Sequence, residues 1–151
     1  MSNTSDTPVL KLEESWAYQV TVLADIVSRR MSELVGAHSD LNLSQWRVMA
    51  AIADEPGRTA SQVNEVTPMD KGIVSRSART LIEKGYAERR PSNTDGRAGH
   101  LHLTTAGQNV YGHIVEALST TGADGRRCLD DLQNEHVREL LKMVIDRYQT
   151  L

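Results

Sequence analysis

Residues 71–83, KGIVSRSARTLIE, combine cations and small side chains at a helical spacing. At about 100° per residue, the apolar side chains fall on one face of a helix. The opposite face, with Lys71 at its border, carries Gly72, Ser75, Arg76, Arg79 and Thr80. Small residues allow a helix to approach base edges in the major groove, and arginine forks bind guanine or phosphate. The pattern therefore predicts the second helix of a helix-turn-helix.

A charged face is also typical of a solvated amphipathic helix that binds nothing. Residues 71–83 alone leave these two interpretations open. The next segment favours DNA binding.

Residues 86–104 have the pattern of a short β-hairpin. A turn built on Asn93, Asp95 and Gly96 leads into the alternating run of residues 101–104. We expect residues 86–90 to pair with residues 101–104. Arg89, Arg90 and Arg97 then flank the turn, and an arginine on a protruding tip suits the narrow minor groove.

Several predicted helices must position these groups. Apolar residues recur at helical steps from Leu12 to Val35 and predict a long helix that ends near Gly36. Ser44 is expected to cap a second helix, which the Pro56-Gly57 pair ends.

Two capped helices should follow across a very short turn. Thr59 and Gln62 predict a capping box on a short helix that turns Ala60, Val63 and Val66 inward. The recognition helix is expected to start with Thr67 as N-cap and Pro68 at the first helical position, and to stop at Gly85.

The C-terminal part should be helical as well. Thr105 and Gln108 predict a capping box, and residues 137–148 return to helical spacing. Gly122 and Gly125 either break the helix between them or allow close contact with another helix.

Composition indicates one ordinary globular domain. The 151 residues are 39% hydrophobic and 25% charged, with no Phe. The formal net charge of -3 excludes coating of nucleic acid by bulk charge. Residues 41–105 nevertheless hold nine Lys and Arg against seven Asp and Glu, whereas the flanking segments hold eight against thirteen. A mildly basic middle thus lies between acidic ends.

One cysteine, Cys128, excludes an internal disulfide and a multi-cysteine metal site. No signal sequence or membrane-spanning run is apparent, so we expect a cytoplasmic protein without membrane contact. His100 and His102 stand two apart, but no matching carboxylate or cysteine completes a metal site. No nucleophile elbow or phosphate loop is present, and an enzyme is not expected. Cys128 is expected to be a partly buried thiol.

The hairpin resembles a known family. DGRAGHLHLTTAG is similar to the wing signature of MarR-family winged helix-turn-helix regulators, an Asp-x-Arg pair followed by Leu-Thr-x-x-Gly. LSQWRVMAAIADEPGRTASQV and MDKGIVSRSARTLIEKGYAERR resemble that family's second to fourth helices and first wing strand. The resemblance implies a mainly α winged helix-turn-helix with a small β-hairpin, dimerised through its N- and C-terminal helices. Gly122 and Gly125 depart from the family's unbroken fifth helix.

The resemblance also implies roles for individual residues. The recognition helix would span residues 68–84, with Lys71, Gly72, Ser75, Arg76 and Arg79 toward DNA. Arg97 would enter the minor groove, and Asp95 would hold the wing by pairing with a basic side chain, with Arg89 and Arg90 nearby.

The expected organisation is one compact domain. A mobile tail covers residues 1–11, a dimerisation helix residues 12–37, the DNA-binding part residues 41–105 and C-terminal dimerisation helices residues 106–151. The resemblance suggests that Trp16, Trp46 and Met49 could line a pocket for a small aromatic or phenolic effector where the dimerisation and DNA-binding parts meet. Core packing explains them equally well and is the preferred interpretation for each residue individually, while some pocket is expected near that junction. No cofactor and no metal are expected.

The residues together with the resemblance imply a homodimeric DNA-binding regulator, most often a repressor in such families, that binds a pseudo-palindromic operator and is released by an effector. The alternative is a winged-helix module that binds a protein partner and no operator.

Overall fold

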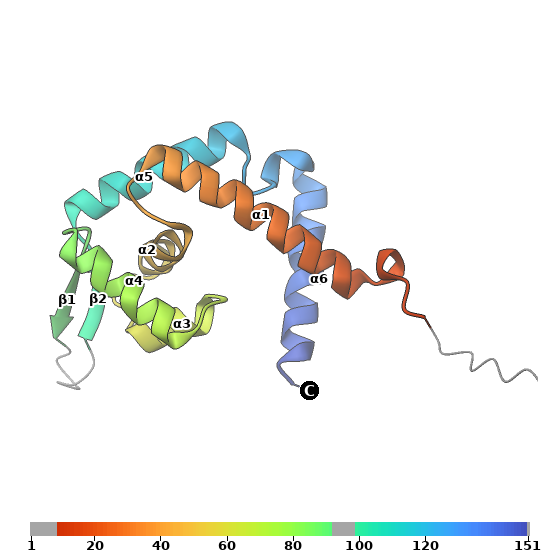
Figure 1. Ribbon diagram of the computed structural model, residues 1–151, viewed down its shortest axis with the longest axis horizontal. Coiled ribbons are helices and arrows are strands. Elements are labelled where there is room, and N and C mark those ends of the chain that lie inside the picture. Colours follow the sequence, from red (N-terminus) through yellow and green to blue (C-terminus); the bar gives the residue numbers. More distant parts are fainter. Residues whose placement is uncertain (1–8, 92–98, 151) are drawn as a thin grey trace, which may run out of the picture.

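The computed structural model describes residues 9–91 and 99–150, which form six α-helices and one antiparallel hairpin (Figure 1). The elements in chain order are α1 (Trp16–His38), α2 (Leu43–Asp54), α3 (Ala60–Val66), α4 (Lys71–Glu83), β1 (Ala87–Pro91), β2 (Gly99–Leu103), α5 (Thr105–Thr121) and α6 (Asp131–Tyr148). Single 3-10 turns cover Leu12–Glu14 and Arg126–Cys128. None of the helices in these ranges has the length and apolar character needed to cross a bilayer.

The start of α2 corrects one prediction from the sequence. Asn42, and not Ser44, caps this helix: its side chain accepts from the Gln45 backbone N–H at 2.9 Å. The Gln45 side chain accepts from the Asn42 N–H at 3.0 Å, which completes a capping box. Ser44 lies inside the first turn. The capping box of Thr59 and Gln62 at the start of α3 is confirmed.

The start of α5 is a joint between the hairpin and the C-terminal helices. Thr104, one residue before the expected Thr105, is its N-cap and accepts from the Gly107 N–H at 3.1 Å. The Thr104 hydroxyl also donates to the Gly85 carbonyl at 2.6 Å. A β-carbon on Gly107 would lie 1.9 Å from the Tyr86 carbonyl oxygen, so only glycine allows this approach.

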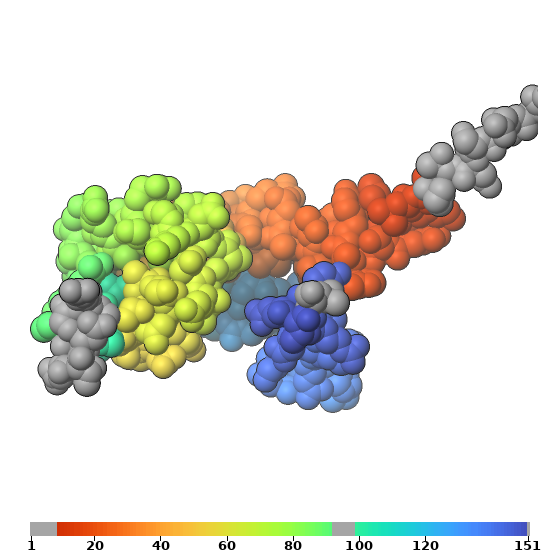
Figure 2. Space-filling model, turned by 90° about the horizontal axis from the view of Figure 1, so that it is seen from below, coloured from red at the N-terminus to blue at the C-terminus, as the bar shows by residue number. Residues whose placement is uncertain are grey.

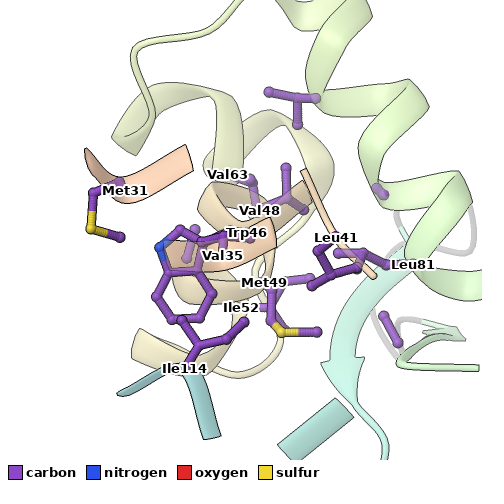
Figure 3. Close-up of a cluster of buried hydrophobic side chains, with 14 of the residues drawn as sticks. Met31, Val35, Leu41, Trp46, Val48, Met49, Ile52, Val63, Leu81 and Ile114 are labelled. Carbon is purple, nitrogen blue, oxygen red and sulfur yellow. The ribbon is translucent and has the colours of Figure 1, made fainter. Parts of the chain in front are cut away.

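α2 lies at the centre of the core (Figure 3), packed against α1, α3, α4, α5 and β2. Its buried side chains meet residues from the C-terminal half of α1, from α3, α4 and α5, and from β2. The core members with no measurable exposure are Val35, Val48, Met49, Ile52, Val63, Leu81, Leu101 and Ile114. Burying each side chain of this kind stabilises the fold by about 1.5–3 kcal/mol. This packing fixes which face of α4 remains open.

The hairpin pairs Ala87 with Leu103 and Arg89 with Leu101; its strand bounds differ by one residue from the predicted ones, except that β2 starts two residues earlier, at Gly99. Leu101 is fully buried and also binds a third segment. Its carbonyl accepts from the Gly57 N–H and its N–H donates to the Arg58 carbonyl, both at 2.9 Å. The turn after α2 therefore fixes the hairpin against the core.

The break after α5 settles the alternative that the sequence leaves open for its glycines. α5 ends at Thr121, and Gly122 closes it in the left-handed region with a φ of 63°. Gly125, at a φ of 88°, starts the 3-10 turn that leads to α6. Asp130 then caps α6 in a capping box with Gln133. The glycines thus end the helix.

The outer helices leave much apolar surface exposed. Figures 1 and 2 show α6 and the start of α1 at one end of the molecule, away from α2, α3, α4 and the hairpin. The large apolar side chains that are exposed on these two helices are Trp16, Tyr18, Val20, Val22, Leu23, Ile26, Leu132, Val137, Leu140, Leu141, Met143, Ile145 and Tyr148. None of the described residues of α6 is fully buried.

Candidate nucleic-acid interface

The α4 helix has one buried and one open face. Val74, Ser77, Ala78 and Leu81 point into the core. Lys71, Gly72, Ser75, Arg76 and Arg79 are all exposed. No ion pair joins Lys71, Arg76 or Arg79 to another residue that the structure describes. Their charges are therefore available to an anionic partner.

The start of α4 differs from the prediction. The helix begins at Lys71 with Asp70 as N-cap, so Thr67 does not cap it and Pro68 is not its first residue. Thr67 closes α3 instead, and its hydroxyl donates to the Val63 carbonyl at 2.8 Å. A Thr-Pro pair has the composition of a helix start, but here it forms the turn between two helices.

The turn between α3 and α4 is held by one side chain. The Asn64 amide donates to the Met69 carbonyl at 2.6 Å. This bond fixes the approach to α4 from the helix before it. Val66, which was predicted to point inward, is 54% exposed at the end of α3. A helix of seven residues buries little more than one turn, and Val63 occupies that position.

The wing strands carry two of the predicted arginines. Arg90 pairs with Glu88 at 2.6 Å on the same strand, so part of its charge is compensated. The exposed Arg89 lies alongside Gly99, where a β-carbon would come within 2.1 Å of its Cδ. Asp95 and Arg97, which were expected at the tip of the wing, lie outside the described residues.

The two strand histidines lie against the turn after α2. His100 Nδ1 is 2.6 Å from the Gly57 carbonyl oxygen, and the His102 ring lies against the Gly57 backbone. Gly57 has a φ of 95°, which favours glycine. No cluster of three metal-ligating side chains occurs in residues 9–91 and 99–150.

The structure does not bring Trp16, Trp46 and Met49 into one pocket. Met49 is fully buried, and Trp46 is 6% exposed and stacks on Tyr111 with ring centroids 5.5 Å apart. Trp16 is 52% exposed and lines a different, apolar groove of about 330 Å³ with Val20, Val144, Ile145 and Tyr148. Trp46 and Met49 are thus core residues, whereas Trp16 belongs to the exposed outer helices.

Cys128 also differs from the prediction, since its side chain is exposed in the 3-10 turn before α6. Asp130, two residues further along the chain, is the N-cap of α6, which gives this carboxylate a structural role.

Sequence reasoning missed one polar cluster at the end of α4. Lys84 Nζ lies 2.5 Å from Asp40 Oδ2, and the Tyr86 hydroxyl donates to Asp40 Oδ1 at 3.1 Å. The hydrogen bond from Lys84 lowers the pKa of Asp40 below its ordinary value, against the effect of desolvation. Burial, and then the bond to Asp40, raise the pKa of Tyr86. No local pattern could reveal this cluster, because Asp40 lies more than 40 residues before Lys84 and Tyr86.

Comparison with known proteins agrees with this arrangement. A family model described as MarR family matches residues 39–98. The chain is 35% identical to the HTH-type transcriptional regulator PetP of Rhodobacter capsulatus over 78 residues. The aligned stretch covers 52% of this chain and 47% of PetP. The matched part is thus about half the length of that relative. BilQ of Clostridium symbiosum, another HTH-type transcriptional regulator, is 26% identical over 88% of this chain and 90% of its own.

Solved structures agree in fold. A MarR/EmrR family regulator from Acinetobacter has a TM-score of 0.83 at 18% identity, over 94% of this chain and all of its own. A cysteine-to-serine mutant of MarR from E. coli, solved in complex with operator DNA, has a TM-score of 0.73 at 20% identity, over 91% of this chain and 99% of its own. At these identities the likeness establishes the winged-helix fold.

Proposed function

We propose that this chain is a transcriptional regulator of the MarR family that binds duplex DNA by sequence, a proposal supported by the family match over residues 39–98 and by the similarity to two HTH-type transcriptional regulators. The observation that carries the proposal is the open face of α4. Three cations, Lys71, Arg76 and Arg79, stand there without an ion-pair partner among the described residues, next to the small Gly72 and Ser75. A regulator of this kind acts on chromosomal DNA, which implies a cytoplasmic location.

The chemistry of this face fits the major groove. Gly72 and Ser75 leave room for the helix to approach base edges, and Arg76 and Arg79 can form bidentate hydrogen bonds with guanine. The short α3 and the turn held by Asn64 precede α4 in the manner of a helix-turn-helix. In this proposal α4 reads the sequence and the rest of the fold orients it.

We further propose that two copies bind together as a homodimer. Many large apolar side chains of α1 and α6 stay exposed in the single chain, and an extensive apolar surface of this kind indicates a protein interface. A twofold dimer presents its two recognition helices to half-sites one helical turn apart, so the operator is pseudo-palindromic.

The wing supplies contacts to the backbone and the minor groove in this proposal. Arg97 would enter the minor groove, and Asp95 would hold it in place. Arg89 is exposed on β1 and can reach a phosphate, whereas Arg90 would first have to leave Glu88. Charges of this kind contribute affinity for all duplexes and little discrimination among them.

The effector remains part of the proposal: a small aromatic or phenolic molecule would release a repressor from its operator. Support comes from a solved relative, PcaV of Streptomyces coelicolor, which is described in complex with its natural ligand. In this chain, Tyr111 and its neighbours Ile52, Pro56, His102 and Leu103 line a cavity of about 350 Å³ beside Trp46, the stacking partner of Tyr111. Arg90 and Gln108 also line this cavity, so its walls are about as polar as they are apolar, which suits an aromatic ligand with polar substituents.

Selection of bound sequences from random duplexes tests the function. A regulator should enrich a site with twofold symmetry, and its affinity for that site should fall steeply with salt as counterions are released. A protein-interaction module would enrich no sequence. It would also show no binding to duplex DNA that depends on salt in this way.

A further inference from the structure

Asp40 links the end of α1 to the end of α4 through both of its carboxylate oxygens. Oδ2 binds Lys84 Nζ at 2.5 Å, and Oδ1 accepts from the Tyr86 hydroxyl at 3.1 Å. Neither Asp40 nor its two partners lies on the open face of α4 that we assign to DNA. The link is therefore outside the proposed recognition surface.

On its own side, Asp40 is fixed to α1. The preceding Ser39 is the C-cap of α1, and its hydroxyl donates to the Val35 carbonyl at 2.7 Å. The following Leu41 is 4% exposed and belongs to the same core cluster as Leu81 of α4 (Figure 3). Asp40 thus stands on a short segment that is anchored at both ends.

On the other side, Lys84 and Tyr86 are fixed to α4. Lys84 is the C-cap of this helix, and its N–H donates to the Thr80 carbonyl at 2.9 Å. The Tyr86 N–H donates to the Leu81 carbonyl at 2.9 Å. Any displacement of these two residues therefore displaces the end of α4.

The same three-residue segment is also held by α5. Thr104, the N-cap of α5, donates from its N–H to the Tyr86 carbonyl at 3.1 Å and from its hydroxyl to the Gly85 carbonyl. Residues 84–86 thus lie between the end of α1 and the start of α5. These are the helices that lead away from the DNA-binding part (Figure 1).

We propose that Asp40 is a positioning residue that sets the orientation of α4 relative to α1 and, in a dimer, the spacing of the two recognition helices. The inference rests on the proposed DNA-binding function. The direction of the change in DNA affinity on removing Asp40 distinguishes this positioning role from a simple effect of its charge. Loss of a negative charge near DNA strengthens binding to every duplex. Loss of the link weakens binding only where the placement of both helices matters.

The test compares Asp40→Asn with Asp54→Asn, which removes the same charge on the DNA-binding part. Arg58, the partner of Asp54, keeps its bonds to Glu55 and to the Ala51 carbonyl in that control. The probes are a duplex enriched from a random pool by the wild-type protein, an unrelated duplex of equal length, and the enriched duplex lengthened or shortened by about one base pair between its half-sites. Thermal unfolding and sedimentation verify folding and assembly of each variant.

For Asp40→Asn we expect about three- to tenfold weaker binding to the enriched duplex, since an exposed ion pair is worth a few-fold and a dimer has two copies. Affinity for the unrelated duplex should not fall, and the penalty for changed spacing should shrink. Lys84→Gln should also lose the spacing preference, whereas Lys84→Arg, which can still reach Asp40, should keep it.

Two results would overturn the inference. Asp40→Asn could bind the enriched duplex as well as Asp54→Asn does, or its spacing penalty could equal that of the wild type. A wild-type protein that enriches no duplex would instead refute the DNA-binding function itself. The two failures are therefore distinguishable.

Discussion

The rings of Trp16 and Tyr148 meet edge to face, with centroids 6.1 Å apart and planes at 83°. Trp16 is the first residue of α1 and Tyr148 the last of α6, so the two outer helices meet at their ends. Both rings are more than half exposed. An aromatic pair that stays this open at the edge of a large apolar surface is typical of an interface that a second chain completes.

The first prediction concerns assembly. The wild-type protein should sediment with twice the mass of one chain, and Leu140→Glu should shift it toward the monomer because a charge would enter the apolar interface. Val66→Glu is the control, since Val66 is equally open but lies at the end of α3. Equal sedimentation of the two variants would contradict the assignment of this surface.

The second prediction concerns the open face of α4. Arg76→Ala and Arg79→Ala should each lose about 1–3 kcal/mol of binding free energy on the enriched duplex if the side chain reads a base. Arg29→Ala is a suitable control, because Arg29 is exposed on α1 and pairs with Asp25. Fluorescence anisotropy titrations on wild-type and base-substituted duplexes measure the loss. Wild-type affinity in both α4 variants would assign DNA recognition to another element.

The third prediction concerns the wing. Arg97→Ala should weaken binding to specific and unrelated duplexes together, and should flatten the dependence of log K on log salt by about one unit per lost phosphate contact. Asp95→Ala should also weaken binding although it removes a negative charge. Titrations at several salt concentrations, with Arg138→Ala on α6 as control, decide this. Tighter binding by Asp95→Ala would contradict a positioning role for this residue.

The fourth prediction concerns two glycines of α5. Gly107→Ala should lower the free energy of unfolding by about 1–3 kcal/mol, because its β-carbon would overlap the Tyr86 carbonyl. Gly112→Ala has open space around its β-carbon and should raise the free energy of unfolding by about 0.5–1 kcal/mol through helix propensity. Urea denaturation of both variants measures the two changes in the free energy of unfolding. Equal changes at the two positions would be incompatible with the close contact between Gly107 and the Tyr86 carbonyl.

The fifth prediction concerns the Tyr86 phenol. Burial and the bond to Asp40 raise its pKa, so its contribution to stability is fully present below the ordinary tyrosine pKa and is lost as pH rises through the folded-state value. The phenolate absorbance of the wild type minus that of Tyr86→Phe gives the titration of this one residue. Its midpoint should lie above the ordinary value and should fall in Asp40→Asn. A midpoint that Asp40→Asn leaves in place would remove Asp40 as a cause.

Periodicity predicts the faces of the helices well, because it reports a single physical condition, namely that one side is buried. The split of α4 between Val74 and Leu81 on one side and Arg76 and Arg79 on the other follows directly from this. Helix ends are less predictable. Thr59 and Thr67 look alike as N-caps in the sequence. Only Thr59 is followed by a side chain, that of Gln62, that accepts a hydrogen bond from the backbone N–H of the capping residue.

Contacts between distant parts of the chain have no such pattern. The bond from Lys84 to Asp40 spans 44 residues and depends on how α1 and α4 pack. The burial of Met49 and the exposure of Trp16 are likewise set by which helices lie beside them. Sequence reasoning could place both residues on apolar faces, but it could not say which of those faces the single chain covers.

The Leu-Thr-x-x-Gly run of the wing signature corresponds to Leu103, Thr104 and Gly107, and none of these needs to touch DNA to explain the run. Leu103 pairs with Ala87, Thr104 caps α5 and binds Gly85, and Gly107 admits the Tyr86 carbonyl. Selection on this run would act through folding. Homologues should therefore retain this run even where their operators diverge or where DNA binding has been lost. The run then indicates common ancestry, whereas the exposed side chains of α4 indicate which DNA sequence each homologue binds.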